Sequence, residues 1–443
     1  MDVAIAYSPE DLHSVAERDE LEDIATVGAE QNVQRSCWDV SITERMVSQL
    51  WDICPLVSRQ LPIELWEHII DFFADDDYGD RDDYDMRQLG QVCRGWYARC
   101  RFHHYERLYM WYMDRREVYR LINSLVEHPD RCSAIKTVWI GIEDQSIGPF
   151  GSFAVRMVQK LPRVEFLRLW CWNWESGQLH AQAFLHITLT FGSVTRLQLF
   201  EVIFPSAVVF GRLMRALPRL SFLECIGVQF KHGCHVTGAV RVPGTLRLDA
   251  ADLDHSDDVF DFLASIGAHI RHLTCYGTDW KKLPELFAVT AESLLSLQVG
   301  YSSDAPSIDL TPTVNLRVLV LDGYLKDIPQ AAGFLSRTSL PNLVELTIKS
   351  WATLFKDGTL DIVQDELNSI DNDSFAQMDR VLSSRQFPAL RKVTFLFHCD
   401  LERSDVLNVI SEGTWRTLLS SRLPALDASG RLLTPVMVEI YQL

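Results

Sequence analysis

Histidine and cysteine side chains could give this chain a metal site. His232, Cys234 and His235 lie close together in the sequence, and His269 lies near His272. A structural zinc site needs four ligands, and no second ligand pair lies at the usual zinc spacing. We therefore expect these side chains to be ordinary surface or core residues, with no metal bound.

Seven aspartates between Asp75 and Asp85 form the densest acidic segment of the chain. An EF-hand calcium loop needs oxygen ligands at positions 1, 3 and 5 and a glutamate at position 12. Counted from Asp75, the fifth position is Gly79, so the calcium pattern fails. A solvated acidic loop is the better interpretation.

Known catalytic motifs are absent from the sequence. It contains no GxxxxGKS/T or GxGxxG phosphate loop, no HExxH zinc motif and no GxSxG elbow. The ten cysteines include no CxxC pair and no local nucleophile signature. We therefore expect a protein that is not an enzyme and needs no cofactor.

Composition limits the partners and the compartment. The 443 residues include 42 basic and 60 acidic side chains, a net charge of −18, which disfavours nucleic acid and membranes as partners. No run of about 18 apolar residues occurs, and the first residues lack the pattern of a secretory signal. We therefore expect a soluble protein of the cytoplasm or nucleus, with its cysteines reduced.

Helical periodicity is clear in the segment Leu61–Phe73. Pro62 suits the first turn of a helix, and apolar residues then follow at i, i+3, i+4 and i+7 from Trp66. Further helices are expected over residues 86–100 and 115–127. The first helix is apolar on more than one side. One side could therefore bind a partner, although a purely intradomain core would have the same spacing.

Short apolar strands recur through the rest of the chain. Each begins with an apolar residue, position 0, and has further apolar residues at positions 3 and 5. Successive strands are 22 to 30 residues apart, with one step of 47, close to the 20–29 residues of leucine-rich repeats. Strands and helices alternating at this period predict a solenoid, and the alternative is an α/β domain with a mixed sheet. Position 0 falls at Ile135, Val164, Val194, Leu220, Pro243, Ile270, Leu294, Leu316, Leu343 and Leu390.

The repeats are irregular. The asparagine or cysteine usual at position 8 is absent, and the assignment at Pro243 depends only on Leu246 and Leu248. The 47-residue step contains an acidic segment, around Asp357 to Asp379, that we interpret as a surface excursion.

Large side chains fall at positions 4 and 6 of several strands, which solenoid geometry turns toward the inner surface. Tryptophan, tyrosine and arginine are frequent binding anchors, so we predict a substrate-binding surface on what we take to be three adjacent strands. The alternative is that these aromatic residues fill gaps in an irregular core. The predicted residues are Arg168, Trp170, Gln198, Phe200 and Tyr276, with Thr274 beside them.

Two segments together resemble an F-box. They are Leu61-Pro-Ile-Glu-Leu-Trp-Glu-His-Ile-Ile and Leu89-Gly-Gln-Val-Cys-Arg-Gly-Trp, with a longer acidic linker between them than usual. The block from Tyr119 to Pro129, followed by Ile135-Lys-Thr-Val-Trp-Ile, resembles the segment after the F-box in large fungal families. The chain is therefore similar to fungal F-box proteins with irregular leucine-rich repeats.

This resemblance implies a substrate-receptor subunit of a Skp-cullin-F-box ubiquitin ligase. In that family the F-box docks a Skp-type adaptor, and through it a cullin, while the repeats bind a protein substrate. The alternative is a leucine-rich-repeat interaction scaffold with no ubiquitin-ligase role, whose helices cap the solenoid. The residues that match adaptor-facing positions are Leu61, Pro62, Leu65 and Ile69 in the first helix and Val92, Cys93 and Trp96 in the second.

Taken together, these patterns predict an α/β protein with a short N-terminal helical F-box-like unit and a degenerate leucine-rich-repeat solenoid. The expected boundaries are a polar, partly helical segment over 1–58, the F-box-like domain over 59–105, a linking helix over 106–133 and the solenoid over 134–443, with an acidic insertion near 355–380.

Overall fold

The computed structural model describes residues 62–75, 88–111, 113–142, 147–171, 174, 181–233, 246–277, 282–301, 310–351, 360–402 and 409–441. The polar segment predicted over 1–58 lies outside them, as does most of the acidic segment after Asp75. The chain divides into two compact units, Met1–Glu67 and His68–Leu443, and the boundary lies within helix α2 (Ile63–Asp75).

In the first unit, the described residues are Pro62 and the first turn of α2. The carbonyl oxygen of Pro62 accepts hydrogen bonds from the N–H groups of Leu65 (3.1 Å) and Trp66 (3.4 Å). A proline fits here because the first N–H groups of a helix have no partner within the helix. The helix predicted from the Leu-Pro opening is confirmed.

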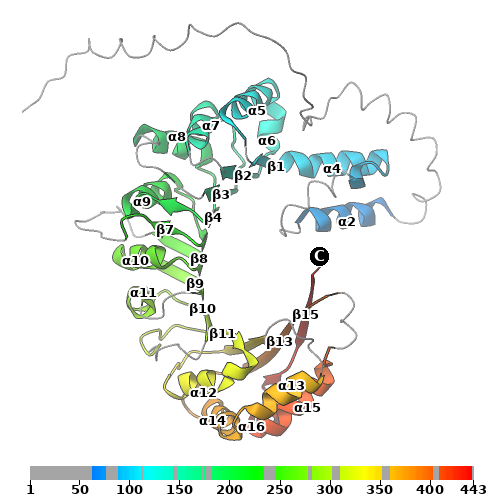
Figure 1. Cartoon of the computed structure of the whole chain (residues 1–443), viewed down its shortest axis with the longest axis vertical. Coiled ribbons are helices and arrows are strands. Elements are labelled where there is room, and N and C mark those ends of the chain that lie inside the picture. The colour runs from blue at the N-terminus through cyan, green and yellow to red at the C-terminus, as the bar shows by residue number, and fades with distance from the viewer. Residues whose placement is uncertain are drawn as a thin grey trace, which may run out of the picture. The chain divides into compact units, whose positions relative to one another are not determined.

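Strands and helices alternate through most of the second unit (Figure 1). Its helices are α4 (Arg94–Glu106), α5 (Arg115–Glu127), α6 (Pro129–Ala134), α7 (Gly148–Arg156), α8 (Ala181–Phe191), α9 (Ala207–Ala216), α10 (Asp257–Ser265), α11 (Leu283–Thr290), η3 (Leu325–Asp327), α12 (Ile328–Ser336), α13 (Leu360–Ser369), α14 (Asn372–Leu382), α15 (Glu412–Arg422) and α16 (Pro424–Ala428). Its strands are β1 (Arg107–Trp111), β2 (Thr137–Ile142), β3 (Phe166–Cys171), β4 (Arg196–Phe200), β5 (Ile203–Phe204), β6 (Phe222–Ile226), β7 (Gln229–Phe230), β8 (Arg247–Asp254), β9 (His269–Tyr276), β10 (Ser296–Gly300), β11 (Val318–Tyr324), β12 (Glu345–Trp351), β13 (Lys392–Glu402), β14 (Leu432–Leu433) and β15 (Val436–Tyr441).

Thirteen of the described strands form one parallel sheet. Its order is β1-β2-β3-β4-β6-β8-β9-β10-β11-β12-β13-β14, and β15 also pairs with β13. Each neighbouring pair is parallel. Parallel neighbours need a crossover between them, and helices supply most of these crossovers, although none is described between β6 and β8 or between β10 and β11. The mixed-sheet alternative is therefore wrong, and the architecture is that of an α/β solenoid-like repeat.

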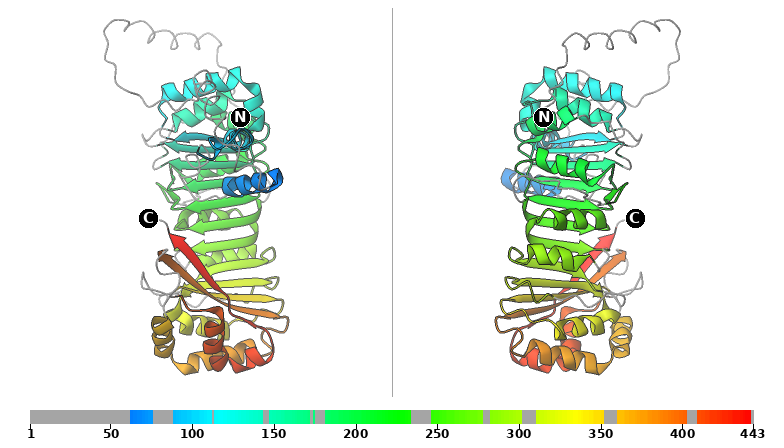
Figure 2. Two further views of the ribbon diagram at one scale, coloured as in Figure 1. Left: turned by 90° about the vertical axis from the view of Figure 1, so that its right-hand side faces the viewer. Right: turned by 90° about the vertical axis from the view of Figure 1, so that its left-hand side faces the viewer.

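The apolar positions of the repeat face the helices. Figures 1 and 2 show α5 and α7–α12 on one face of the sheet, and we call the opposite face the strand face. Position 3 of each strand pairs in register with position 3 of the next, and each of these side chains is at most 2% exposed. Burying one leucine side chain stabilises a fold by about 1.5–3 kcal/mol, so this row is a major source of stability. The row is Val138, Leu167, Leu197, Leu223, Ala251, Leu273, Leu297, Leu319, Leu346 and Val393.

The register of β8 corrects one assignment. Leu223 of β6 pairs with Ala251, so position 0 of this repeat is Leu248 and not Pro243, which lies outside the described residues. Alanine at position 3 gives a weak apolar signal, because its side chain is small, and this weak signal explains the error.

A left-handed turn at position 7 identifies four consecutive repeats. Glu201, Gly227, His255 and Gly277 follow β4, β6, β8 and β9 with φ angles of 51°, 65°, 47° and 56°. Glycine adopts this conformation without strain, whereas other residues rarely do. At Gly277 a side chain would also overlap the His255 ring. The repeat is therefore regular in backbone geometry at a position where its residue types vary.

Helices α13 and α14 correct the interpretation of the acidic insertion. Val363 and Leu367 of α13, and Phe375 and Met378 of α14, are at most 1% exposed and belong to the main core. Residues 360–382 are therefore packed structure and not a surface excursion. Residues 355–359 lie outside the described residues.

The segment predicted as a linking helix, 106–133, belongs to the sheet and its core. Strand β1 pairs in parallel with β2, and Val118, Ile122 and Leu125 of α5 are buried in the main core. Asp114 caps α5 by accepting a hydrogen bond from the N–H of Glu117 (2.7 Å). These residues form the first strand–helix unit of the solenoid.

Candidate functional site

The predicted adaptor-binding residues of the first unit are largely exposed. Pro62 is exposed and Leu65 is 43% exposed, although leucine side chains are usually buried. Leu61 lies outside the described residues. Ile63 is exposed as well, so the start of α2 presents apolar side chains to solvent.

In the second unit the predicted adaptor-binding residues differ in burial. Val92, just before α4, is 48% exposed, whereas Cys93 and Ile69 are half-buried. Trp96 packs against a small core formed by Ile70, Ala74 and Cys100. Trp96 therefore contributes to packing within the helical segment, while Val92 remains available to a partner.

An ion-pair cluster joins α2 to α4 within the second unit. The Arg99 guanidinium donates to both carboxylate oxygens of Asp71 (2.7 and 2.6 Å), and His103 Nε2 lies 2.8 Å from Asp71 Oδ1. The Arg99 hydrogen bonds lower the pKa of Asp71 to about 2, and His103 contributes less. This cluster was not predicted from the sequence. Its only signal is the i, i+4 spacing of Arg99 and His103, which places them on one helix face.

The strand face carries the predicted substrate-binding residues. Arg168 and Trp170 lie on β3, and Gln198 and Phe200 lie opposite them on β4. The rings of Trp170 and Phe200 meet edge to face, with centroids 5.5 Å apart. These four side chains are half-buried, so the structure brings them together on one accessible surface.

Tyr276 does not belong to that group. It lies on β9, and strands β6 and β8 separate it from β4, so the three strands are not adjacent. Its hydroxyl donates to Asp322 Oδ2 (3.3 Å) and contacts the side-chain amide of Gln298. Asp322, only 6% exposed, also accepts a hydrogen bond from Trp351 Nε1 (2.5 Å). Tyr276 is therefore part of a separate polar network, where burial and then Asp322 raise its pKa.

Two further tryptophans lie beside the predicted residues. The Trp111 ring, on β1, is 4.7 Å from the Trp170 ring on β3. They meet across Gly141 of β2, where a Cβ atom would lie 2.7 Å from the Trp111 ring. The Arg168 guanidinium lies 4.5 Å from the Trp139 ring centroid. Trp111 and Trp139 were not predicted, because the sequence pattern did not identify β1 as a strand and was not extended to the inner positions of β2.

An acidic group lies next to this aromatic surface. Glu224 on β6 pairs in register with Asp252 on β8, and Asp254 follows on β8. Burial raises the pKa of Asp252 to about 6, and the charges of Glu224 and Asp254 add to the effect. Glu224 is partnered, because Gln198 Nε2 donates to it (2.6 Å) and Arg196 lies 3.2 Å away. Among the described residues, none donates a hydrogen bond to the Asp252 carboxylate.

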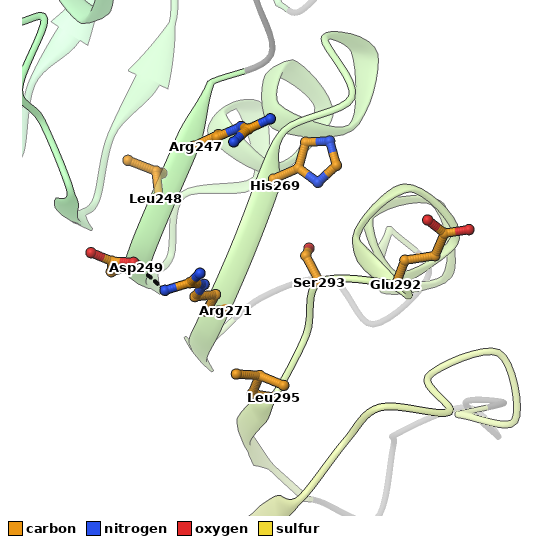
Figure 3. Close-up of a pocket in the computed structure, with 8 residues that line it drawn as sticks. All are labelled: Arg247, Leu248, Asp249, His269, Arg271, Glu292, Ser293 and Leu295. Atoms are coloured by element: carbon orange, nitrogen blue, oxygen red, sulfur yellow. Dashed lines mark hydrogen bonds and ion pairs between the residues drawn. The ribbon is translucent and has the colours of Figure 1, made fainter.

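A pocket of about 520 Å³ lies where strands β8 and β9 begin (Figure 3). Arg247 and Asp249 line it from β8, His269 and Arg271 line it from β9, and Ser293 lines it from the segment before β10. Arg271 and Asp249 pair with each other at 3.2 Å. The pocket therefore contains charges of both signs that partly neutralise one another, and it shares no residue with the strand-face group.

Neither a metal-binding cluster nor a membrane-spanning helix occurs in the described part of the chain. Over those residues, no three His, Cys, Asp or Glu side chains gather closely enough to hold a metal ion. Within the same residues, no helix has the length and apolar character needed to cross a membrane.

Comparisons with known proteins add little. No family model matches the chain, and no curated protein sequence matches it. Among solved structures, a chain from the crystal structure of the Rad7 and Elc1 complex in yeast is similar, with 12% identity and a TM-score of 0.31 over 92% of this chain and 94% of that chain. A TM-score of this size does not establish a shared fold.

Proposed function

We propose that this chain is the substrate-receptor subunit of a Skp-cullin-F-box ubiquitin ligase. The observation that carries the proposal is the exposure of Leu65 and Val92, which occupy adaptor-facing positions of the F-box-like segments. A leucine that becomes buried against a partner contributes about 1.5–3 kcal/mol to binding, so exposed apolar side chains at motif positions suit a docking role.

The solenoid would then hold the substrate on its strand face. Half-buried Trp170, Phe200 and Arg168 are residue types that often dominate binding energies. In this proposal the chain carries out no chemistry itself. It places a bound protein substrate near the enzyme that transfers ubiquitin, which raises the effective concentration of the reacting groups.

The test is co-purification of the full chain with a Skp-type adaptor. Wild type should bind the adaptor, and Leu65→Ala combined with Val92→Ala should weaken binding about 30-fold or more, because two apolar contacts are lost. The matched control is Leu185→Ala with Leu189→Ala on α8, whose side chains are 59% and 40% exposed. The control variant should bind the adaptor like wild type.

Failure of the wild-type chain to bind any Skp-type adaptor would contradict the proposal and favour the interaction scaffold with no ligase role. Equal binding by Leu65→Ala/Val92→Ala and wild type would instead remove these residues from the docking surface.

A further inference from the structure

One line of side chains crosses the strand face from aromatic to acidic. Position 6 of β3, β4, β6 and β8 is occupied by Trp170, Phe200, Ile226 and Asp254, each in register with the next. Neighbouring strands are about 4.8 Å apart, so the line extends roughly 14 Å. An extended peptide advances about 3.3 Å per residue and would cover this line with four or five residues.

A second line, at position 4, lies beside the first. It runs from Arg168 on β3 through Gln198, Glu224 and Asp252 on β4, β6 and β8. Together with Asp254, these residues place three carboxylates on two adjacent strands. Arg196 pairs with Glu224, and His255 Nε2 lies 3.8 Å from Asp254 Oδ1, whereas Asp252 has no ion-pair partner among the described residues.

We propose that this surface binds an extended segment of the substrate protein, with an apolar or aromatic side chain against Trp170 and Phe200 and an arginine or lysine against Asp252 and Asp254. This inference rests on the proposed function only in identifying the bound protein as a ligase substrate. The surface itself lies entirely within the second unit.

Charge complementarity determines the choice of partner. The three carboxylates lie on β6 and β8, whereas the two guanidinium groups of this surface, Arg168 and Arg196, lie on β3 and β4, so the acidic end would attract a basic segment and repel an acidic one. Burial and like-charged neighbours raise the pKa of Asp252, which means that its ionised form is poorly stabilised in the free protein. A bound cation would supply the missing stabilisation. The aromatic end adds a stacking surface, and a guanidinium group can also lie against an aromatic ring.

The first experiment selects binders for the full wild-type chain from a displayed pool of random 12-residue peptides. Enriched peptides should contain an arginine or lysine within about four residues of an apolar or aromatic side chain, the distance that the line of side chains sets. One enriched peptide is then synthesised with a fluorophore, and its affinity is measured by anisotropy. Replacing its basic residue with uncharged citrulline or glutamine should weaken binding about tenfold.

Variants of the chain locate the site of binding. Asp252→Asn with Asp254→Asn should weaken binding of the synthetic peptide about tenfold, and Trp170→Ala should weaken it by at least as much. The matched control is Asp365→Asn with Asp373→Asn, which changes the net charge equally at exposed residues of α13 and α14. That control should leave the affinity unchanged.

Three results would overturn the inference: enrichment of acidic or purely apolar peptides, no enrichment at all, or equal affinity for wild type and Asp252→Asn/Asp254→Asn. Adaptor binding, measured separately, distinguishes the two proposals. A chain that binds basic peptides through Asp252 but no adaptor would contradict the ligase role alone. A chain that binds the adaptor but not basic peptides would contradict only this inference.

Discussion

Trp170 and Phe200 lie on one surface because side chains alternate along a strand, which puts positions 4 and 6 of β3 and β4 on the same face. Grouping them with Tyr276 was wrong, because sequence spacing does not show which strands lie between. The contact of Trp111 with Trp170 was also beyond prediction, since it depends on the missing side chain of Gly141.

Asp252 leads to a prediction about stability and pH. Its pKa, about 6 in the folded chain against an ordinary 3.8, means that the folded state holds this proton more tightly than the unfolded state. Stability is therefore lost as the pH rises through this interval, and the loss is complete above about pH 6. Asp252→Asn removes the charge and should stabilise the chain at pH 7.5 by on the order of 1 kcal/mol, after allowing for screening by water.

Chemical denaturation at pH 7.5 and at pH 4 would measure this effect. The gain should shrink toward pH 4, where Asp252 is protonated in wild type as well. The facing charges are Glu224 and Asp254, which raise the pKa, and Arg196, which lowers it. Asp365→Asn, at an exposed site, serves as the control. A wild-type chain more stable than Asp252→Asn at pH 7.5 would show that this carboxylate is well compensated.

At the scale of elements, the strands of the repeat and the helices near residues 61–73 and 115–127 followed from periodicity, whereas the acidic helices and the register of β8 did not. The helix predicted over 115–127 matches α5, because its apolar residues recur clearly. Helices α13 and α14 were missed because their many carboxylates obscured apolar residues at helical spacing, among them Val363, Leu367 and Ile370. In β8, the small Ala251 concealed the register. Composition was therefore a poorer guide than spacing.

Asp379 of α14 gives a prediction about how these elements are joined. It is 7% exposed, and its carboxylate accepts hydrogen bonds from the N–H groups of Ala425 and Leu426 (2.9 Å each) at the start of α16. Asp379→Ala would remove the acceptor of both N–H groups, of which only that of Leu426 is buried, and should destabilise the chain by about 1–3 kcal/mol. Asp379→Asn retains one acceptor and should cost less.

Thermal and chemical denaturation would rank the Asp379 variants against Asp373→Ala, an exposed aspartate in the first turn of the same helix. The expected order of stability is wild type and Asp373→Ala, then Asp379→Asn, then Asp379→Ala. Equal stability of Asp379→Ala and wild type would mean that the first turn of α16 does not depend on this carboxylate.

At the scale of the whole molecule, the sequence predicted the repeat architecture but misplaced where it begins and missed how it ends. Residues 106–133 were expected to link two parts, yet β1 and α5 complete the sheet and core of the first repeat. At the other end, β14 and β15 both pair with β13 and were not anticipated. Terminal repeats differ from internal ones because they must cover the apolar end of the row of buried position-3 side chains. A repeat pattern in the sequence is therefore weakest at the two ends of the solenoid.

The position of the first repeat can be tested by truncation. A chain that starts at Glu106 retains β1, whose Leu108 pairs in register with Val138 of β2, together with α5. A chain that starts at Ala134 loses both elements and uncovers Val138 and Ile140, which are at most 2% exposed in the full chain. Uncovering buried residues of this size removes about 1.5–3 kcal/mol of stabilisation for each, so the shorter chain should melt at a lower temperature and bind an apolar dye more strongly.

Circular dichroism and dye fluorescence on both truncations would measure the difference. Equal melting temperatures would show that the solenoid is stable without β1 and α5, and would restore residues 106–133 to the role of a linking segment.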